Sequence, residues 1–305
     1  MSSVSSGSPA WLAWGGVLLA GALWGGGALA AHAALASGMT PASLALARFA
    51  LGWPLLWWWA RRMASGGGGD SGARWSAQPW SVRRLVLGAG LAMALNVACW
   101  FMAIQAMGPA LATVVAICCA PVFVALLAAL LGQERLGRVR SAALLVAVAG
   151  TALVVLPVDA SAGQLQWRGV AWGLASALSY AVVALCNARL PHTLPAARVA
   201  AWSMAAAAGG AVLAVAGSGF AWPQTLAGWL GAAYTGLVAT GLAYLAFVAG
   251  TRRIGPTASV VGTLVEPLVA VLLAAWWLGE VLLWRQWLGG GLLCAAIASL
   301  ALRRC

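Results

Sequence analysis

The sequence predicts an all-α integral membrane protein with ten transmembrane helices, arranged as two inverted repeats of five helices. Of 305 residues, 63% are hydrophobic and 7% are charged, and a soluble domain of this size could not cover so much apolar side chain with so few charges. A proline-containing motif also occurs twice, and arginines gather at alternate ends of the apolar segments. These three observations together define the fold class.

Apolar segments interrupted by Gly, Pro and Arg give ten candidate helices of about 19 to 26 residues, and about 20 residues cross a hydrocarbon layer of about 30 Å. The first segment is too long, and too poor in preceding basic residues, to be a cleaved secretory signal. In the first half the predicted helices are 11–36, 40–60, 83–106, 109–132 and 139–157. In the second half they are 168–190, 196–217, 225–250, 256–279 and 284–302.

One motif occurs in both halves of the chain. The first copy contains Gly108-Pro109, Ala120-Pro121 and Gly132-Gln133-Glu134, and the second contains Gly255-Pro256, Glu266-Pro267 and Gly279-Glu280. In each copy the closing glutamate follows the second proline by 13 residues (121 to 134 and 267 to 280). We therefore expect two related units, residues 1–157 and 158–305, that form one transmembrane domain. Because each unit has five helices, the second would enter the membrane from the opposite side.

The basic residues, all of them arginine, predict the orientation of the chain. One set of alternate loops and the C-terminal tail contain Arg61, Arg62, Arg74, Arg83, Arg84, Arg135, Arg138, Arg140, Arg189, Arg198, Arg252, Arg253, Arg303 and Arg304. The other set of loops contains only Arg168 and Arg285. Since arginine-rich loops remain in the cytoplasm, we expect a multi-pass protein of the bacterial inner (plasma) membrane with both termini cytoplasmic. The longest cytoplasmic loop, 63–82, contains four consecutive glycines and is expected to be a flexible connection.

The composition also argues against several function classes. The net charge of +12 is spread over helix ends rather than gathered in a patch, so nucleic-acid binding is not expected. The six cysteines and two histidines have no metal-ligand spacing, and we expect neither a metal nor a cofactor. The apolar segments contain no Ser/His/Asp, Cys/His or paired-carboxylate arrangement, so we do not expect an enzyme.

The order of the motifs resembles the drug/metabolite transporter superfamily in its ten-helix, two-repeat EamA form, from about Trp11 to Arg304. The residues that carry the resemblance are Leu23-Trp24-Gly25, Arg48-Phe49, Gly108-Pro109 through Pro121 to Glu134-Arg135, Ala243-Tyr244, Arg252-Arg253-Ile254-Gly255, and Glu266-Pro267 through Gly279-Glu280. The resemblance implies a small-molecule transporter surrounded by membrane lipid, with a mid-membrane cavity lined by helices 1, 3, 4, 6, 8 and 9. More loosely, the 19 tryptophans resemble YddG-type exporters, which implies export of neutral or aromatic amino acids.

Aromatic residues near the middle of the predicted helices are candidates for the cavity lining, because their rings can stack on a substrate or hold its ammonium group by cation–π contact. They are Trp24, Trp100, Tyr180, Tyr244 and Phe247. Most other tryptophans lie near helix ends, as in the aromatic belts of membrane proteins. Asn96 is the best polar candidate, because a mid-span amide needs partners that lipid does not offer.

Charged residues and prolines inside the apolar segments give further hypotheses. Glu266 could bind a substrate ammonium or carry a proton, or it could brace the helix beside Pro267. Arg48 could hold a carboxylate, but its place near a helix end favours a structural role. Pro121 and Pro267 should kink their helices and act as hinges between the two halves.

Alternative functions remain open on the same sequence. The scaffold could export cationic drugs, in which case Glu266 would be essential, or it could translocate lipid. It could also be a membrane scaffold that transports nothing. Glu266 permits proton coupling, and simple export down a gradient fits equally well.

Overall fold

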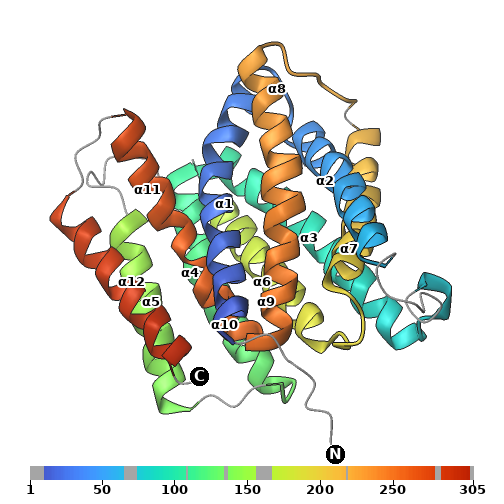
Figure 1. The fold of residues 1–305 in the computed structure, drawn as a ribbon. Helices are drawn as coiled ribbons and strands as arrows, with labels where there is room; N and C mark the ends of the chain where they lie inside the picture. Colours follow the sequence, from blue (N-terminus) through green and yellow to red (C-terminus); the bar gives the residue numbers. More distant parts are fainter. Residues whose placement is uncertain are drawn as a thin grey trace, which may run out of the picture.

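The computed structural model describes residues 10–64, 74–107, 109–133, 137–155, 167–217, 219–278 and 283–302, and these segments contain helices and no strand. The first half contains α1 (Ala10–Ala36), α2 (Pro41–Ala64), the short 3-10 helix η2 (Trp75–Ala77), α3 (Trp80–Met107), α4 (Pro109–Leu130) and α5 (Arg138–Val155). The second half contains α6 (Trp167–Arg189), α7 (Ala196–Ala216), α8 (Leu226–Ala233), the π-helix η3 (Tyr234–Leu242), α9 (Ala243–Ile254), α10 (Pro256–Thr263), α11 (Val265–Leu278) and α12 (Trp284–Leu302). Figure 1 shows these helices packed side by side in one bundle.

All ten predicted segments are helical, and the all-α fold class is confirmed. Five helical stretches in the described segments are long and apolar enough to cross a membrane by themselves: 11–36, 80–103, 167–189, 196–216 and 226–254. The number of ten spans stays a prediction. Several sequence features fall outside the described residues: the glycine run 66–69, the connection between the halves, Gly108, Glu134, Gly279, Glu280 and the C-terminal arginines.

The predicted helix 256–279 is divided at Leu264 into α10 and α11. Pro267 explains the division, because it lacks the N–H group that would bond the carbonyl of Thr263. Two glycines of α1, Gly21 and Gly25, pack against this break: a Cβ added to Gly25 would lie 2.6 Å from the Glu266 carbonyl oxygen. A Cβ added to Gly21 would lie 2.6 Å from Val265 Cγ1 of α11 and 3.0 Å from the Thr263 carbonyl oxygen of α10. In the first half, α4 runs through Pro121 without a break.

The predicted helix 225–250 contains a π-helix between α8 and α9. Two glycines of η3, Gly236 and Gly241, are five residues apart, which is the hydrogen-bond spacing of a π-helix. Added Cβ atoms there would meet Leu51 and Leu55 of α2, at 2.5 and 2.8 Å respectively. The π-helix therefore presents both glycines to the same neighbouring helix and lets the two backbones approach closely.

The helix contacts follow a two-fold pattern. α2 packs on α7 and α5 on α12, and these pairs join equivalent helices of the two halves. α3 packs on α6, and its counterpart α8–η3–α9 packs on α1 in the same way. In Figure 1, α5 and α12 lie side by side and run in opposite directions. This is the relation that inverted copies require.

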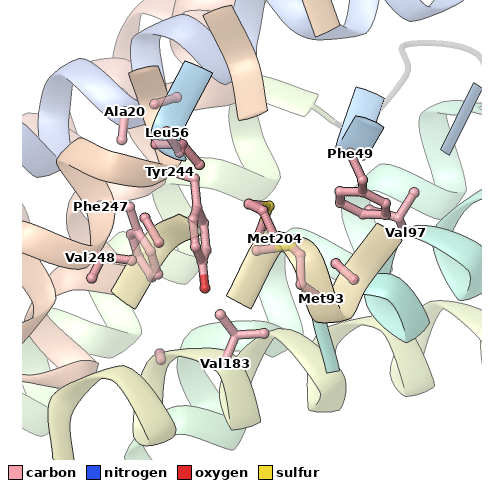
Figure 2. Packing of buried hydrophobic residues seen from close by; sticks show 14 of the residues in the cluster. Ala20, Phe49, Leu56, Met93, Val97, Val183, Met204, Tyr244, Phe247 and Val248 are labelled. Carbon is pink, nitrogen blue, oxygen red and sulfur yellow. The ribbon is translucent and has the colours of Figure 1, made fainter. Parts of the chain in front are cut away.

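The largest apolar cluster lies between the halves and includes Phe49, Met93, Met204, Tyr244 and Phe247. Figure 2 shows Tyr244 and Phe247 on one side of Met204, and Phe49 on the other. All three aromatic side chains are fully buried. This cluster therefore joins the two halves and forms one boundary of the site.

The α6–α7 loop is tied to the end of α9. The buried Arg252 donates hydrogen bonds to the carbonyl oxygens of Leu194, at 2.8 Å, and Pro191. Burial and the charges of Arg252 and Arg253 lower the pKa of His192, in the same loop, below its usual range. The loop is therefore held in place at the end of the bundle opposite the α1–α2 loop.

Candidate functional site

A cavity of about 160 Å³ lies between the two halves. It has room for several water molecules or for a small solute. The predicted lining helices all contribute to it, through α1, α3, α4, α6, η3, α9, α10 and α11. Residues of α2 and α7, which the prediction did not include, also line the cavity.

The cavity lies nearer to the end of the bundle that carries the α1–α2 loop. The lining residues of α2 are Leu44, Arg48 and Phe49, all in the first part of that helix. Those of α1 begin at Trp24, in its second half. At the other end of the bundle, buried residues fill the space between the helices, including Leu56, Val86 and Val183.

Two opposite charges face the cavity. Arg48 on α2 and Glu266 on α11 both line it, and their charges act on each other. They make no direct ion pair, and Glu266 has no hydrogen-bond partner among the described residues. The side-chain atoms of Arg48 and Glu266 that lack a hydrogen-bond partner are not fully buried, since none of them is among the buried atoms without a partner. The guanidinium and the carboxylate therefore each have some accessible surface. Both groups are therefore open to a solute in the cavity.

The π-helix fixes the orientation of Arg48. The Nε atom of Arg48 donates a hydrogen bond to Thr240 Oγ1 at 3.0 Å. In turn, Thr240 Oγ1 donates to the carbonyl oxygen of Thr235 at 2.7 Å. The guanidinium also lies 5.6 Å from the ring centre of Phe49. One nitrogen of Arg48 is thus held, while the other two make no hydrogen bond within the described segments.

Aromatic rings form one wall of the cavity. The Trp24 ring lies 6.1 Å from Tyr180 and 5.4 Å from Phe247, and Tyr180 stacks on Phe247 at 5.6 Å. The indole N–H of Trp24 donates to the carbonyl oxygen of Ala239 at 2.6 Å. The hydroxyl of Tyr180 lies 3.2 Å from Thr263 Oγ1. These contacts hold the rings in fixed positions.

Asn96 is held by the helix opposite it. Its side-chain N–H₂ group donates to the carbonyl oxygen and to the hydroxyl of Ser176, both at 3.0 Å. This joins α3 to α6 across the boundary between the halves. The amide has the partners that a mid-span Asn needs, and it still lines the cavity.

Most residues that the sequence singled out come together here. Trp24, Asn96, Trp100, Tyr180, Tyr244 and Glu266 line the cavity. Phe247 does not: it is fully buried behind Trp24 and Tyr180 and supports them. Arg48, for which the sequence favours a structural role, also lines the cavity. Its hydrogen-bond partner Thr240 could not be predicted, because the two residues are 192 positions apart in the chain.

The sequence matches the EamA-like transporter family twice, over residues 11–156 and 167–302. The chain belongs to the EamA-like transporter family. A Bacillus subtilis (strain 168) protein named as the uncharacterized transporter YwfM is 30% identical over 205 residues, covering 67% of this chain and 69% of that protein. A solved crystal structure has the same fold, with a TM-score of 0.76 and 24% identity, covering 98% of this chain and 97% of the other.

Membership of the EamA-like family confirms a multi-pass membrane transporter rather than an enzyme. It also agrees with the two repeats of the fold. The small-molecule substrate and the lipid surroundings follow from the family in general terms. The YddG-type relationship and the amino-acid substrate stay predictions. In the described residues, no three His, Cys, Asp or Glu side chains gather where they could hold a metal ion.

Proposed function

We propose that this EamA-like transporter exports small amphipathic metabolites from the bacterial cytoplasm, with neutral and aromatic amino acids as the leading substrates. The observation that carries the proposal is the carboxylate of Glu266, which faces a cavity walled by Trp24, Trp100 and Tyr180 and lacks a protein hydrogen-bond partner among the described residues. An unpartnered acid at this depth is costly unless water or a ligand satisfies it.

The α-ammonium group of an amino acid fits this acid. A cation beside aromatic faces gains about 0.5–2 kcal/mol from each ring, and the apolar side chain of the substrate gains from burial against the same rings. The apolar residues Ala116, Ile117 and Leu264 extend this surface. The halves would rock about the cavity and open it to each side in turn, with Pro121 and Pro267 as hinges.

Flux into proteoliposomes tests the proposal. Purified protein is reconstituted, and counterflow of a panel of neutral, aromatic, acidic and basic amino acids is measured with and without a pH gradient. We expect counterflow of neutral and aromatic amino acids, and a loss of at least tenfold in Glu266→Gln because the ammonium partner is removed. The charge-matched control is Glu134→Gln. Glu134 follows α4 in the sequence, and this variant should keep the wild-type rate.

The panel also separates the alternatives. Wild-type rates in Glu266→Gln would remove this residue from the mechanism. Export of cationic drugs is the second candidate, favoured by the same carboxylate, which faces the cavity without a protein hydrogen-bond partner among the described residues. It predicts that quaternary ammonium compounds compete and that amino acids do not. If the protein carries no amino acid of the panel, amino-acid export is wrong and the transporter carries a solute of another class.

A further inference from the structure

Arg48 has donors that no protein group uses. Its Nε atom is bound to Thr240, whereas its two terminal nitrogens have no hydrogen-bond partner within the described segments and border the cavity. Each terminal nitrogen of a guanidinium carries two N–H groups. The cavity wall therefore offers several charged N–H donors, and no protein acceptor among the described residues binds them.

A free guanidinium inside the spans needs an explanation. Charged side chains within membrane segments are rare and mark binding sites or ion pairs when they occur. Among the described residues, the opposite charge that acts on Arg48 is Glu266, and it does so without contacting it. A structural arginine would have bonded its terminal nitrogens to backbone carbonyls, as Arg252 does with Leu194 and Pro191 of the α6–α7 loop.

The hydrogen bond to Thr240 has a consequence for geometry. A guanidinium that is held through Nε by a hydroxyl, itself anchored to the Thr235 carbonyl, cannot rotate freely. Its terminal nitrogens keep one direction, and that pre-organisation favours planar, two-point binding of a carboxylate. The contact to the face of Phe49 limits its movement further.

We propose that Arg48 is the carboxylate-binding residue of the cavity, positioned by Thr240 of the π-helix. The inference rests on the proposed function and narrows it: the substrate carries a carboxylate as well as an ammonium group. Arg48 and Glu266 together bind the two ends of a zwitterion. The site then distinguishes an amino acid from the corresponding amine, which a cavity with Glu266 alone could not do.

Three related compounds test this: L-phenylalanine, phenethylamine, which lacks the carboxylate, and 3-phenylpropanoate, which lacks the ammonium group. Each is measured as a competitor of phenylalanine counterflow in proteoliposomes. We expect Arg48→Gln to raise the KM for phenylalanine about tenfold to hundredfold, the usual effect of losing hydrogen bonds between charged groups. Inhibition by phenethylamine should change less than twofold.

Two further variants separate binding from structure. Arg48→Lys keeps the charge and loses two-point binding, so its KM should lie between those of wild type and Arg48→Gln. Thr240→Val removes the positioning hydroxyl and should raise the KM for phenylalanine severalfold with little change in phenethylamine inhibition. Arg62→Gln, at the other end of α2 and outside the cavity lining, is the control and should behave as wild type.

A second readout does not depend on transport. Thermal unfolding of the detergent-solubilised protein is followed with each compound. Phenylpropanoate and phenylalanine should stabilise wild type, and the effect of phenylpropanoate should vanish in Arg48→Gln. If phenylpropanoate stabilises both equally or neither, or if Arg48→Gln weakens phenethylamine and phenylalanine binding alike, the carboxylate site is wrong.

The two proposals fail in different ways. If phenylalanine is not carried but phenylpropanoate binds in an Arg48-dependent manner, Arg48 is an anion site and amino-acid export is wrong. If phenylalanine is carried and Arg48→Gln carries it with an unchanged KM, amino-acid export stands and the role of Arg48 is overturned.

Discussion

Trp24 shows how a single residue combines two roles. Its ring packs against Tyr180 and Phe247, and its indole N–H bonds the carbonyl oxygen of Ala239 in η3. Trp24→Phe keeps an aromatic ring and removes the donor. We expect it to lower the free energy of unfolding by about 0.5–1.5 kcal/mol, the usual contribution of one hydrogen bond. Thermal or denaturant unfolding of the solubilised protein measures this loss.

Trp100→Phe is the matched control, because Trp100 also lines the cavity but donates no hydrogen bond within the described residues. Trp100→Phe should be less destabilising than Trp24→Phe, and equal losses would show that ring size matters rather than the hydrogen bond.

The mid-span aromatic residues could be predicted from the sequence, because a tryptophan far from a helix end does not fit the interfacial belt. The place of Arg48 could not, because it depends on Thr240, which approaches only in the folded chain.

At the scale of elements, the ten helical segments could be predicted because long apolar segments and Gly/Pro boundaries are local signals. The π-helix η3 could not, because its cause is the fit of Gly236 and Gly241 against α2. The break at Leu264 was expected as a kink at Pro267, and the structure divides the helix at that turn. Whether Pro121 and Pro267 act as hinges stays a prediction.

The contact between η3 and α2 yields a graded prediction. A Cβ at Gly236 would lie 2.5 Å from Leu51 Cβ, close to the backbone of α2, so that Gly236→Ala must push α2 away. Overpacking of this kind costs about 1–3 kcal/mol, and we expect that loss in the unfolding free energy. The shift should also separate Thr240 from Arg48 and raise the substrate KM.

Two other glycines serve as controls for Gly236. At Gly241 the nearest atom is Leu55 Cδ2, the end of a flexible side chain, so Gly241→Ala should cost much less. Gly209 of α7 has nothing within 4 Å, and Gly209→Ala should leave stability unchanged or raise it, because alanine favours helix. Equal effects at all three positions would contradict close packing of η3 on α2.

At the scale of the whole molecule, the two halves are equivalent in topology but not in contacts. α6 packs against α9 and α10, through the Asn187–Tyr244 hydrogen bond of 3.3 Å and the Tyr180–Thr263 contact. Within the described segments, the equivalent helix α1 makes no comparable contact with α3 or α4. The cavity lies there instead. The bundle is therefore closed at its α6–α7 end, and inverted repeats predict a second state in which the halves exchange these arrangements.

The exchanged state predicts a specific pair of residues. Tyr244 and Val97 each lie 11 residues before the glycine of their Gly-Pro pair (244 and 255; 97 and 108). Asn187 follows Tyr180 of α6 by seven residues, and Ala31 follows Trp24 of α1 by the same number. Because Asn187 contacts Tyr244 here, Ala31 should contact Val97 in the other state. Ala31 and Val97 are apolar residues of the cavity lining with small side chains, so cysteine is tolerable at each position.

Oxidative cross-linking tests this exchange. In a background without the native cysteines, Ala31→Cys with Val97→Cys should cross-link more efficiently when a substrate gradient drives the transporter into the second state. Transport should stop and should return on reduction. The pair Asn187→Cys with Tyr244→Cys should show the opposite dependence, and each single variant should show no cross-link. If both pairs cross-link to the same extent under all gradients, the halves do not exchange conformations, and the cavity would have to open by a movement that breaks the two-fold relation.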